Sequence, residues 1–162
     1  MDNLENELIP PQERSLARDH VMLNIAHEIA RLGTCKRRQV GAVAVDRYHR
    51  VMAIAHNGLP KDYPHCADFA CGGAFYPSGT HLEACEAIHA EANLLTFVAD
   101  IMRIDTVYLT HSPCRTCIKS LANTSCRRLV FAAEYPHPEA QEYWLRIPGR
   151  SWELFSRQSP QR

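Results

Sequence analysis

Three side chains that can bind zinc, with a carboxylate next to one of them, lie in the second half of the chain. His89 is followed two positions later by Glu91, and Cys114 and Cys117 form a C-x-x-C pair. A catalytic zinc takes three protein ligands and keeps its fourth position for water, whose pKa it lowers to about 7. The set therefore predicts a zinc site that activates water, with Glu91 beside the metal as the group that carries the proton.

The spacing of these residues also predicts where two helices begin. Residues two apart on a helix do not share a face, so His89 and Glu91 can serve one metal only at an open helix N-terminus. Cys114 and Cys117 fit one side of the first turn of a second helix, because the preceding Pro113 suits a helix start. Two helix N-termini would then direct their positive ends at the metal, which favours thiolates over thiols.

A closed structural zinc, with Glu91 as an ordinary solvated helix residue, is the alternative interpretation. An isolated C-x-x-C pair would favour it. Here the histidine, the carboxylate beside it and the proline before Cys114 favour a catalytic site, because a structural zinc has no use for an adjacent carboxylate.

The composition is typical of a neutral globular domain. A chain of 162 residues is long enough to bury about two-thirds of its unfolded surface in a single core. Lysine plus arginine and aspartate plus glutamate both count 18, so the net charge does not attract polyanions and disfavours long nucleic acids as partners. No apolar run could cross a bilayer, and the polar, acidic start is unlike a signal peptide. We expect a soluble cytoplasmic protein.

The cysteine count supports that location. Seven cysteines are an odd and high number, and most cluster with histidines between residues 35 and 117. This pattern favours metal thiolates in a reducing compartment over a disulfide framework.

The hydrophobic pattern predicts a mixed sheet covered by helices. A first helix should begin at Leu16 and end at Gly33, with one apolar face made of Val21, Ile25, Ile29 and Leu32. A hairpin of strands 40–45 and 51–55 should follow, and then helices at 89–98, 114–122 and 138–146 and strands at 106–109, 129–132 and 152–155. Alternating strands and helices in the second half predict parallel pairing after an antiparallel hairpin.

The domain boundaries follow from the same pattern. Residues 1–14 are predicted to be a flexible N-terminal arm, because Pro10 and Pro11 should exclude a helix there. Residues 15–156 are predicted to form a single domain, and residues 157–162 a C-terminal tail. Within the domain, about 25 to 30 residues after Asn57-Gly58 show no period, which is unusual unless a ligand or metal orders them.

The zinc motif and several other segments carry a resemblance to a known family. H-x-E followed by P-C-x-x-C is typical of zinc-dependent nucleobase deaminases. The wider segments resemble, in this order, the deoxycytidylate (dCMP) deaminases of bacteria and phages: Cys35-Lys-Arg-Arg-Gln-Val-Gly-Ala-Val43, Asn57-Gly58-Leu59-Pro60, Pro64-His65-Cys66, Cys71, Cys85 and Tyr108-Leu-Thr-His-Ser-Pro-Cys114.

The resemblance implies a fold and a reaction. The fold would be the α/β cytidine deaminase-like three-layer α/β/α fold, with a five-stranded mixed sheet in the order 2-1-3-4-5 flanked by helices, usually assembled as a hexamer. The reaction would be hydrolysis of dCMP to dUMP, which feeds thymidylate synthesis. Glu91 would take the proton of the activated water, pass it to N3 of the cytosine and then help ammonia leave from C4.

The resemblance and the basic residues together suggest a substrate-binding set. Asn57 matches the asparagine that holds the sugar of the target nucleotide, although a plain turn residue is the alternative. A 5′-phosphate requires an arginine fork or a lysine, and Arg37, Arg38 and Arg115 are the candidates. For each arginine, a solvated surface charge is the alternative.

Four upstream cysteines match cysteine positions of these relatives, some of which bind a second, structural zinc. They are Cys35, Cys66, Cys71 and Cys85. A second Zn²⁺ would order the long loop, with His65 or His81 able to replace one cysteine. Buried free thiols are the alternative, and Cys126 is left as a small core residue.

One segment departs from the family. Its members usually read Gly-Tyr-Asn-Gly-x-Pro-x-Gly where this chain reads Ala55-His56-Asn57-Gly58-Leu59-Pro60-Lys61-Asp62. In many relatives this loop contributes to activation by dCTP and inhibition by dTTP, which implies an allosteric nucleotide with Mg²⁺. The altered loop puts that regulation in question and raises a 5-modified dCMP as an altered substrate.

Two further functions are compatible with the zinc motif. One is a deaminase of the same fold that acts on a nucleoside, a free base or a base in RNA or DNA. The other is a non-catalytic zinc-binding module used for assembly. The neutral net charge and the upstream cysteines weigh against the first of these.

Overall fold

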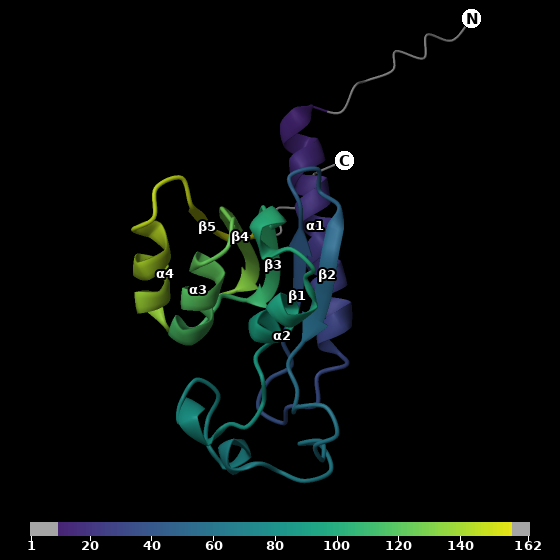
Figure 1. Cartoon of the computed structure of the whole chain (residues 1–162), viewed down its shortest axis with the longest axis vertical. Helices are drawn as coiled ribbons and strands as arrows, with labels where there is room; N and C mark the ends of the chain where they lie inside the picture. Colours follow the sequence, from purple (N-terminus) through teal and green to yellow (C-terminus); the bar gives the residue numbers. More distant parts are fainter. Residues whose placement is uncertain (1–9, 157–162) are drawn as a thin grey trace, which may run out of the picture.

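The computed structural model describes residues 10–156, which form a five-stranded mixed sheet with helices on both faces (Figure 1). The strands are β1 Gly41–Val45, β2 Val51–His56, β3 Thr106–His111, β4 Arg128–Ala133 and β5 Ser151–Leu154, in the spatial order β2-β1-β3-β4-β5. β1 pairs antiparallel with β2 and β3, whereas β3, β4 and β5 are parallel. The sheet order and the mixed pairing expected from the sequence are confirmed.

The helices divide between the two faces of the sheet. α1 Pro11–Ala30 covers one face, while α2 Ala90–Phe97, α3 Arg115–Ala122 and α4 Pro138–Leu145 lie on the other (Figure 1). β1 is buried along its whole length, because Val43 and Val45 pack under α1 and Ala42 and Ala44 pack in the opposite cluster. None of the helices in residues 10–156 is long and apolar enough to cross a membrane.

The first helix corrects two sequence-based expectations. It begins at Pro11, with Pro10 as its N-cap, because the first helical position needs no N–H donor and tolerates proline. The N-terminal arm therefore does not extend to residue 14. Residues 1–9 and the tail 157–162 lie outside the described residues.

The buried face of α1 only partly matches the predicted one. Ile25 packs against the core as expected, but Val21 is 51% exposed, and Leu32, which lies beyond the end of the helix, is 60% exposed. The residues that face the sheet are Asp19, Leu23, Ala26 and Ala30. Small residues are needed there because α1 lies directly on β1: a Cβ added to Gly41 would be 1.9 Å from the Ala26 carbonyl oxygen.

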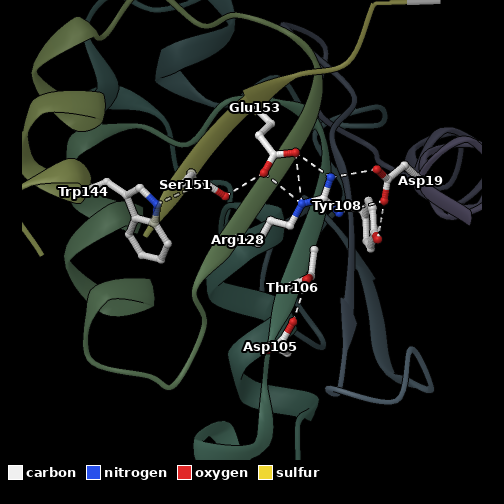
Figure 2. Close-up of polar contacts among 8 residues, drawn as sticks. All are labelled: Asp19, Asp105, Thr106, Tyr108, Arg128, Trp144, Ser151 and Glu153. Carbon is white, nitrogen blue, oxygen red and sulfur yellow. Dashed lines mark hydrogen bonds and ion pairs between the residues drawn. The ribbon is translucent and has the colours of Figure 1, made fainter. Parts of the chain in front are cut away.

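Asp19 is the buried member of a half-buried ionic network that ties α1 to the parallel strands (Figure 2). The Arg128 guanidinium donates to both oxygens of Asp19, at 2.8 and 2.7 Å, and its Nε donates to Glu153 Oε1 at 2.9 Å. The Tyr108 hydroxyl donates to Asp19 Oδ1 at 2.7 Å. The hydrogen bond from Arg128 to Asp19, and after it the one to Glu153, raise the pKa of Arg128, although burial opposes this shift.

The long segment after β2 projects away from the sheet (Figure 1). Its ends meet in a short bridge, in which Gly58 N donates to Ile88 O at 3.1 Å and Ile88 N donates to Gly58 O at 2.8 Å. Between them lie only the 3-10 turns η1 Gly72–Phe75 and η2 Leu82–Ala84. A further 3-10 turn, η3 Ile101–Arg103, leads into β3.

Candidate active site

The three predicted zinc ligands meet where α2 and α3 begin. His89 is the N-cap of α2 and Cys114 the N-cap of α3. His89 Nδ1 lies 3.5 Å from Cys114 Sγ and 3.4 Å from Cys117 Sγ. Ligand atoms bound to one tetrahedral zinc lie roughly 3.5 Å apart, given Zn–N and Zn–S bonds of about 2.0 and 2.3 Å. The side chains are therefore already spaced to hold zinc, and this is the one such three-ligand cluster within residues 10–156.

Glu91 lies in the first turn of α2 and is 4% exposed. Burial raises the pKa of its carboxyl to about 6, although the attraction of His89 opposes the shift. A buried carboxyl that titrates near neutral pH can both accept and return a proton.

The thiols are held at the same place by hydrogen bonds. Hydrogen bonds from Cys117 and, secondarily, from His89 lower the pKa of Cys114 to about 3, against the effect of its burial. The same contact raises the pKa of Cys117. A bound metal would hold both sulfurs as thiolates.

These groups line a cavity. Its wall includes His89, Glu91 and Cys114, and it also takes in Asn57 from the end of β2 and Tyr135 from beyond β4. With a metal bound to the three ligands, the arrangement would place a metal-bound water next to a buried carboxyl at the wall of this cavity.

Comparison with known proteins identifies the family. The model of the cytidine and deoxycytidylate deaminase zinc-binding region matches residues 16–133. The chain belongs to this family. This match confirms the resemblance to the deoxycytidylate deaminases that the sequence motifs indicated.

Two curated relatives give the likeness in numbers. The chain is 33% identical over 127 residues to the deoxycytidylate deaminase of Mycobacterium phage D29, a match that covers 72% of this chain and 94% of that protein. It is 34% identical over 122 residues to ComE operon protein 2 of Bacillus subtilis, covering 72% of this chain and 60% of that protein.

A solved structure shares the fold. It is the dCMP deaminase of cyanophage S-TIM5 in complex with dCMP and dUMP, which matches with a TM-score of 0.68 and 22% identity. The match covers 91% of this chain and 100% of that one. The cytidine deaminase-like fold expected from the sequence is thus confirmed.

The structure gives Asn57 a backbone-holding role in this deaminase site. Asn57 Nδ2 donates to the Arg38 carbonyl at 2.8 Å, and Asn57 Oδ1 accepts from Val40 N at 2.8 Å. The side chain is buried, and a Cβ at Gly33 would be 2.8 Å from its Oδ1. Asn57 therefore fixes the chain that leads into β1 while it lines the cavity.

The three candidate arginines differ in position. Arg37 lines the cavity, but its Nη2 donates to the carbonyls of Pro77 and Thr80, at 2.6 and 2.5 Å. Arg38 also lines the cavity, with Cζ 5.1 Å from the ring centroid of Tyr135. Arg115 is exposed and is not part of the cavity wall, so the structure does not bring it to the predicted position.

Two residues of the cavity wall were not singled out from the sequence. His111 ends β3, and burial, helped by the charges of Arg38 and His27, lowers its pKa to about 4, so the ring is neutral at pH 7. Tyr135 follows the carboxyl end of β4. Loops at the carboxyl ends of parallel strands commonly form binding sites, and this rule could have drawn attention to Tyr135.

The four upstream cysteines are only partly gathered. Cys66 Sγ lies 3.8 Å from Cys71 Sγ, and both thiols are buried. Cys85 is near enough to Cys35 and Cys71 for their charges to add to burial in raising its thiol pKa. The two histidines predicted as substitute ligands are exposed, and His81 Nδ1 faces Glu83 Oε1 at 3.2 Å.

Proposed function

We propose that the protein is a zinc-dependent deoxycytidylate deaminase that hydrolyses dCMP to dUMP and ammonia and so supplies dUMP for thymidylate synthesis. The observation that carries this proposal is the buried Glu91 carboxyl beside a His-Cys-Cys zinc set, inside one cavity. The match to a phage deoxycytidylate deaminase over 94% of that protein supports the choice of substrate.

The chemistry follows from the roles that the residues can take. His89, Cys114 and Cys117 would hold the zinc, which would supply a water of pKa about 7. The Glu91 carboxylate would take a proton from that water and give it to N3 of the cytosine ring while the water oxygen bonds to C4. Glu91 would then carry the remaining proton of the new C4 hydroxyl to the amino group, so that the C4–N bond breaks and ammonia leaves.

A substrate panel tests the proposal. The zinc-loaded protein is incubated with dCMP, dCTP, deoxycytidine, cytosine and an oligonucleotide that contains cytosine, and the loss of cytosine absorbance is followed. We expect dCMP to be the best substrate. Turnover of none of the five would exclude the enzyme, and turnover of the oligonucleotide without dCMP would reassign it to nucleic-acid editing.

We extend the proposal to a second, structural zinc held by Cys35, Cys66, Cys71 and Cys85. The adjacent Cys66 and Cys71 sulfurs, and the influence of Cys35 on Cys85, support a thiolate site at the base of the projecting segment. Metal analysis of the purified protein should give close to two zinc ions per chain. A value close to one would remove this site.

The assembly is proposed to be a homo-oligomer, and a hexamer by resemblance to the family. Exposed apolar side chains support an interface: Val21 on the outside of α1, Leu32 just beyond the end of that helix, and Val51 and Ile54 on the edge strand β2. Light scattering should give the mass of six chains, and a monomer at micromolar concentration would contradict the proposal.

Regulation and location complete the proposal. By resemblance to the family, dCTP with Mg²⁺ would activate the enzyme and dTTP would inhibit it. Adding each nucleotide to the dCMP assay tests whether the altered loop 55–62 retains this regulation.

A cytoplasmic location is supported by the seven free cysteines, because a reducing compartment preserves thiols.

A further inference from the structure

Four side chains form a continuous series of contacts from the start of α4 to the zinc cavity. Glu139 Oε1 lies 2.9 Å from His137 Nδ1. The His137 ring stacks on Tyr135, with centroids 5.0 Å apart and an interplanar angle of 28°. The Arg38 guanidinium lies over Tyr135, with Cζ 5.1 Å from the ring centroid. We call this set of Arg38, Tyr135, His137 and Glu139 the Arg38 stack.

The Arg38 guanidinium has free donors. Within residues 10–156 its nitrogens take part in neither a hydrogen bond nor an ion pair, and the face of Tyr135 holds it in place. A cation on an aromatic face keeps its N–H groups available at the edge of the guanidinium plane. Because Arg38 lines the cavity, those donors suit an anionic group of a bound ligand.

Arg37 also lines the cavity, but it is a weaker candidate than Arg38 for binding the anionic group of a ligand. Its Nη2 is occupied by the carbonyls of Pro77 and Thr80. Its Nη1 is buried and has no partner among the described residues. Arg37 therefore ties the 77–80 turn to the cavity wall and has only Nη1 and Nε left, whereas Arg38 offers its whole edge.

Both ends of Arg38 are fixed. Asn57 Nδ2 binds its backbone carbonyl at 2.8 Å, and Tyr135 carries its guanidinium. The Tyr135 backbone is fixed in turn, because its N–H donates to Ser112 Oγ at 2.7 Å. A long side chain held in this way loses less conformational entropy when it binds a ligand.

We propose that Tyr135 is the positioning residue for nucleotide specificity: its ring holds Arg38 where the guanidinium binds the 5′-phosphate, and so selects a nucleoside monophosphate over a nucleoside. The inference rests on the proposed function, since it takes the deoxynucleotide as the occupant of the cavity. His137, oriented by Glu139, stacks on the Tyr135 ring and supports it.

Binding of the reaction product tests this role. The dissociation constants of dUMP and of deoxyuridine are measured by calorimetry on zinc-loaded protein, and their ratio reports the contribution of the phosphate. Arg38→Gln should lower that ratio about 10- to 100-fold, as expected for a lost charge-assisted hydrogen bond. Tyr135→Leu should lower it about 3- to 30-fold, while Tyr135→Phe, which keeps the aromatic face, should retain it.

The double variant separates positioning from direct contact. If Tyr135 acts through Arg38, then Tyr135→Leu should change the ratio little on the Arg38→Gln background. Additive effects, or equal weakening of dUMP and deoxyuridine by Tyr135→Leu, would overturn the proposal, and so would loss of the ratio in Tyr135→Phe. Zinc content and thermal unfolding of each variant establish that it is folded. Failure of the wild type to bind dUMP or to turn over dCMP would instead exclude the proposed function.

Discussion

At the level of single residues, burial decides what Glu91 can do. An exposed carboxyl at the start of α2 would remain ionised at neutral pH and would stabilise the helix. Glu91 instead is 4% exposed, and this burial raises its pKa to about 6. Its position beside the ligands, with no bond to the metal required of it, matches a proton carrier.

Replacing Glu91 should separate metal binding from catalysis. We expect Glu91→Gln to keep its zinc and to lose at least about 10²- to 10⁴-fold in kcat, because the amide cannot take a proton from water. Zinc content and steady-state turnover of dCMP measure the two effects. Glu86→Gln, an exposed position before α2, is the matched control. Activity retained in Glu91→Gln would refute the proton-carrier role.

The residues of the site were predictable where spacing within a motif determined them. His89, Glu91, Cys114 and Cys117 needed only local sequence. Tyr135 and the holding role of Asn57 depend on contacts between segments far apart in the chain, which no local pattern encodes. The same limit applies to choosing among the three arginines, because only the fold separates Arg115 from the cavity.

At the level of elements, α1 shows what periodicity can and cannot predict. The 3.6-residue pattern correctly indicated a helix, yet Val21 stays exposed. The face on the sheet combines Leu23 with two alanines and a buried Asp19 that has a partner in Arg128. Close approach of two backbones and a distant ion pair thus outweighed hydrophobicity in choosing the buried face.

A glycine to alanine change tests the close approach of α1. In Gly41→Ala the new Cβ would lie 1.9 Å from the Ala26 carbonyl oxygen and 2.9 Å from Ala30 N, both backbone atoms. We expect a loss of at least about 2 kcal/mol in the free energy of unfolding, because the helix must move off the sheet. In the control Gly72→Ala the new Cβ lies 3.4 Å from its nearest neighbour, so the change should stay within about 0.5 kcal/mol. Urea unfolding measures both, and equal stabilities would contradict the close approach.

The ionic network of Figure 2 gives a second prediction for the same helix. Arg128→Met would leave Asp19 and Glu153 side by side without their cation. Loss of one member of a buried ion pair costs about 3–5 kcal/mol, and because the Arg128 side chain is 27% exposed, we expect a smaller loss of about 2–3 kcal/mol. The neighbouring Arg127→Met, whose side chain is 70% exposed, should lower the free energy of unfolding much less than Arg128→Met does. Chemical denaturation compares the two, and similar losses would argue against a special role for Arg128.

At the level of the whole molecule, the topology brings the site together. The helices that carry the zinc ligands both begin at one end of the sheet, and the loops after β2 and β4 supply Asn57 and Tyr135. Sequence reasoning reached the sheet order through the family resemblance, because an alternation of strands and helices allows several orders. It also left the segment between Gly58 and Ile88 undefined, since that segment has almost no regular hydrogen bonding of its own.

The projecting segment is the part of the molecule whose order should depend on metal. With few helical or strand hydrogen bonds inside it, a structural zinc on the upstream cysteines would supply the missing constraint. We expect a zinc chelator to make residues 59–88 the first site of proteolytic cleavage, while the sheet and its helices resist. Cys71→Ser should give the same cleavage without chelator and retain one zinc per chain, because His89, Cys114 and Cys117 still bind theirs. Cys126→Ser, a buried cysteine away from both sets, is the control and should keep two. The segment also has close packing of its own, since a Cβ added to Gly73 would be 2.8 Å from the Cβ of Cys85. Equal protease resistance of Cys71→Ser and the control would show that this packing, and not a metal, holds the segment.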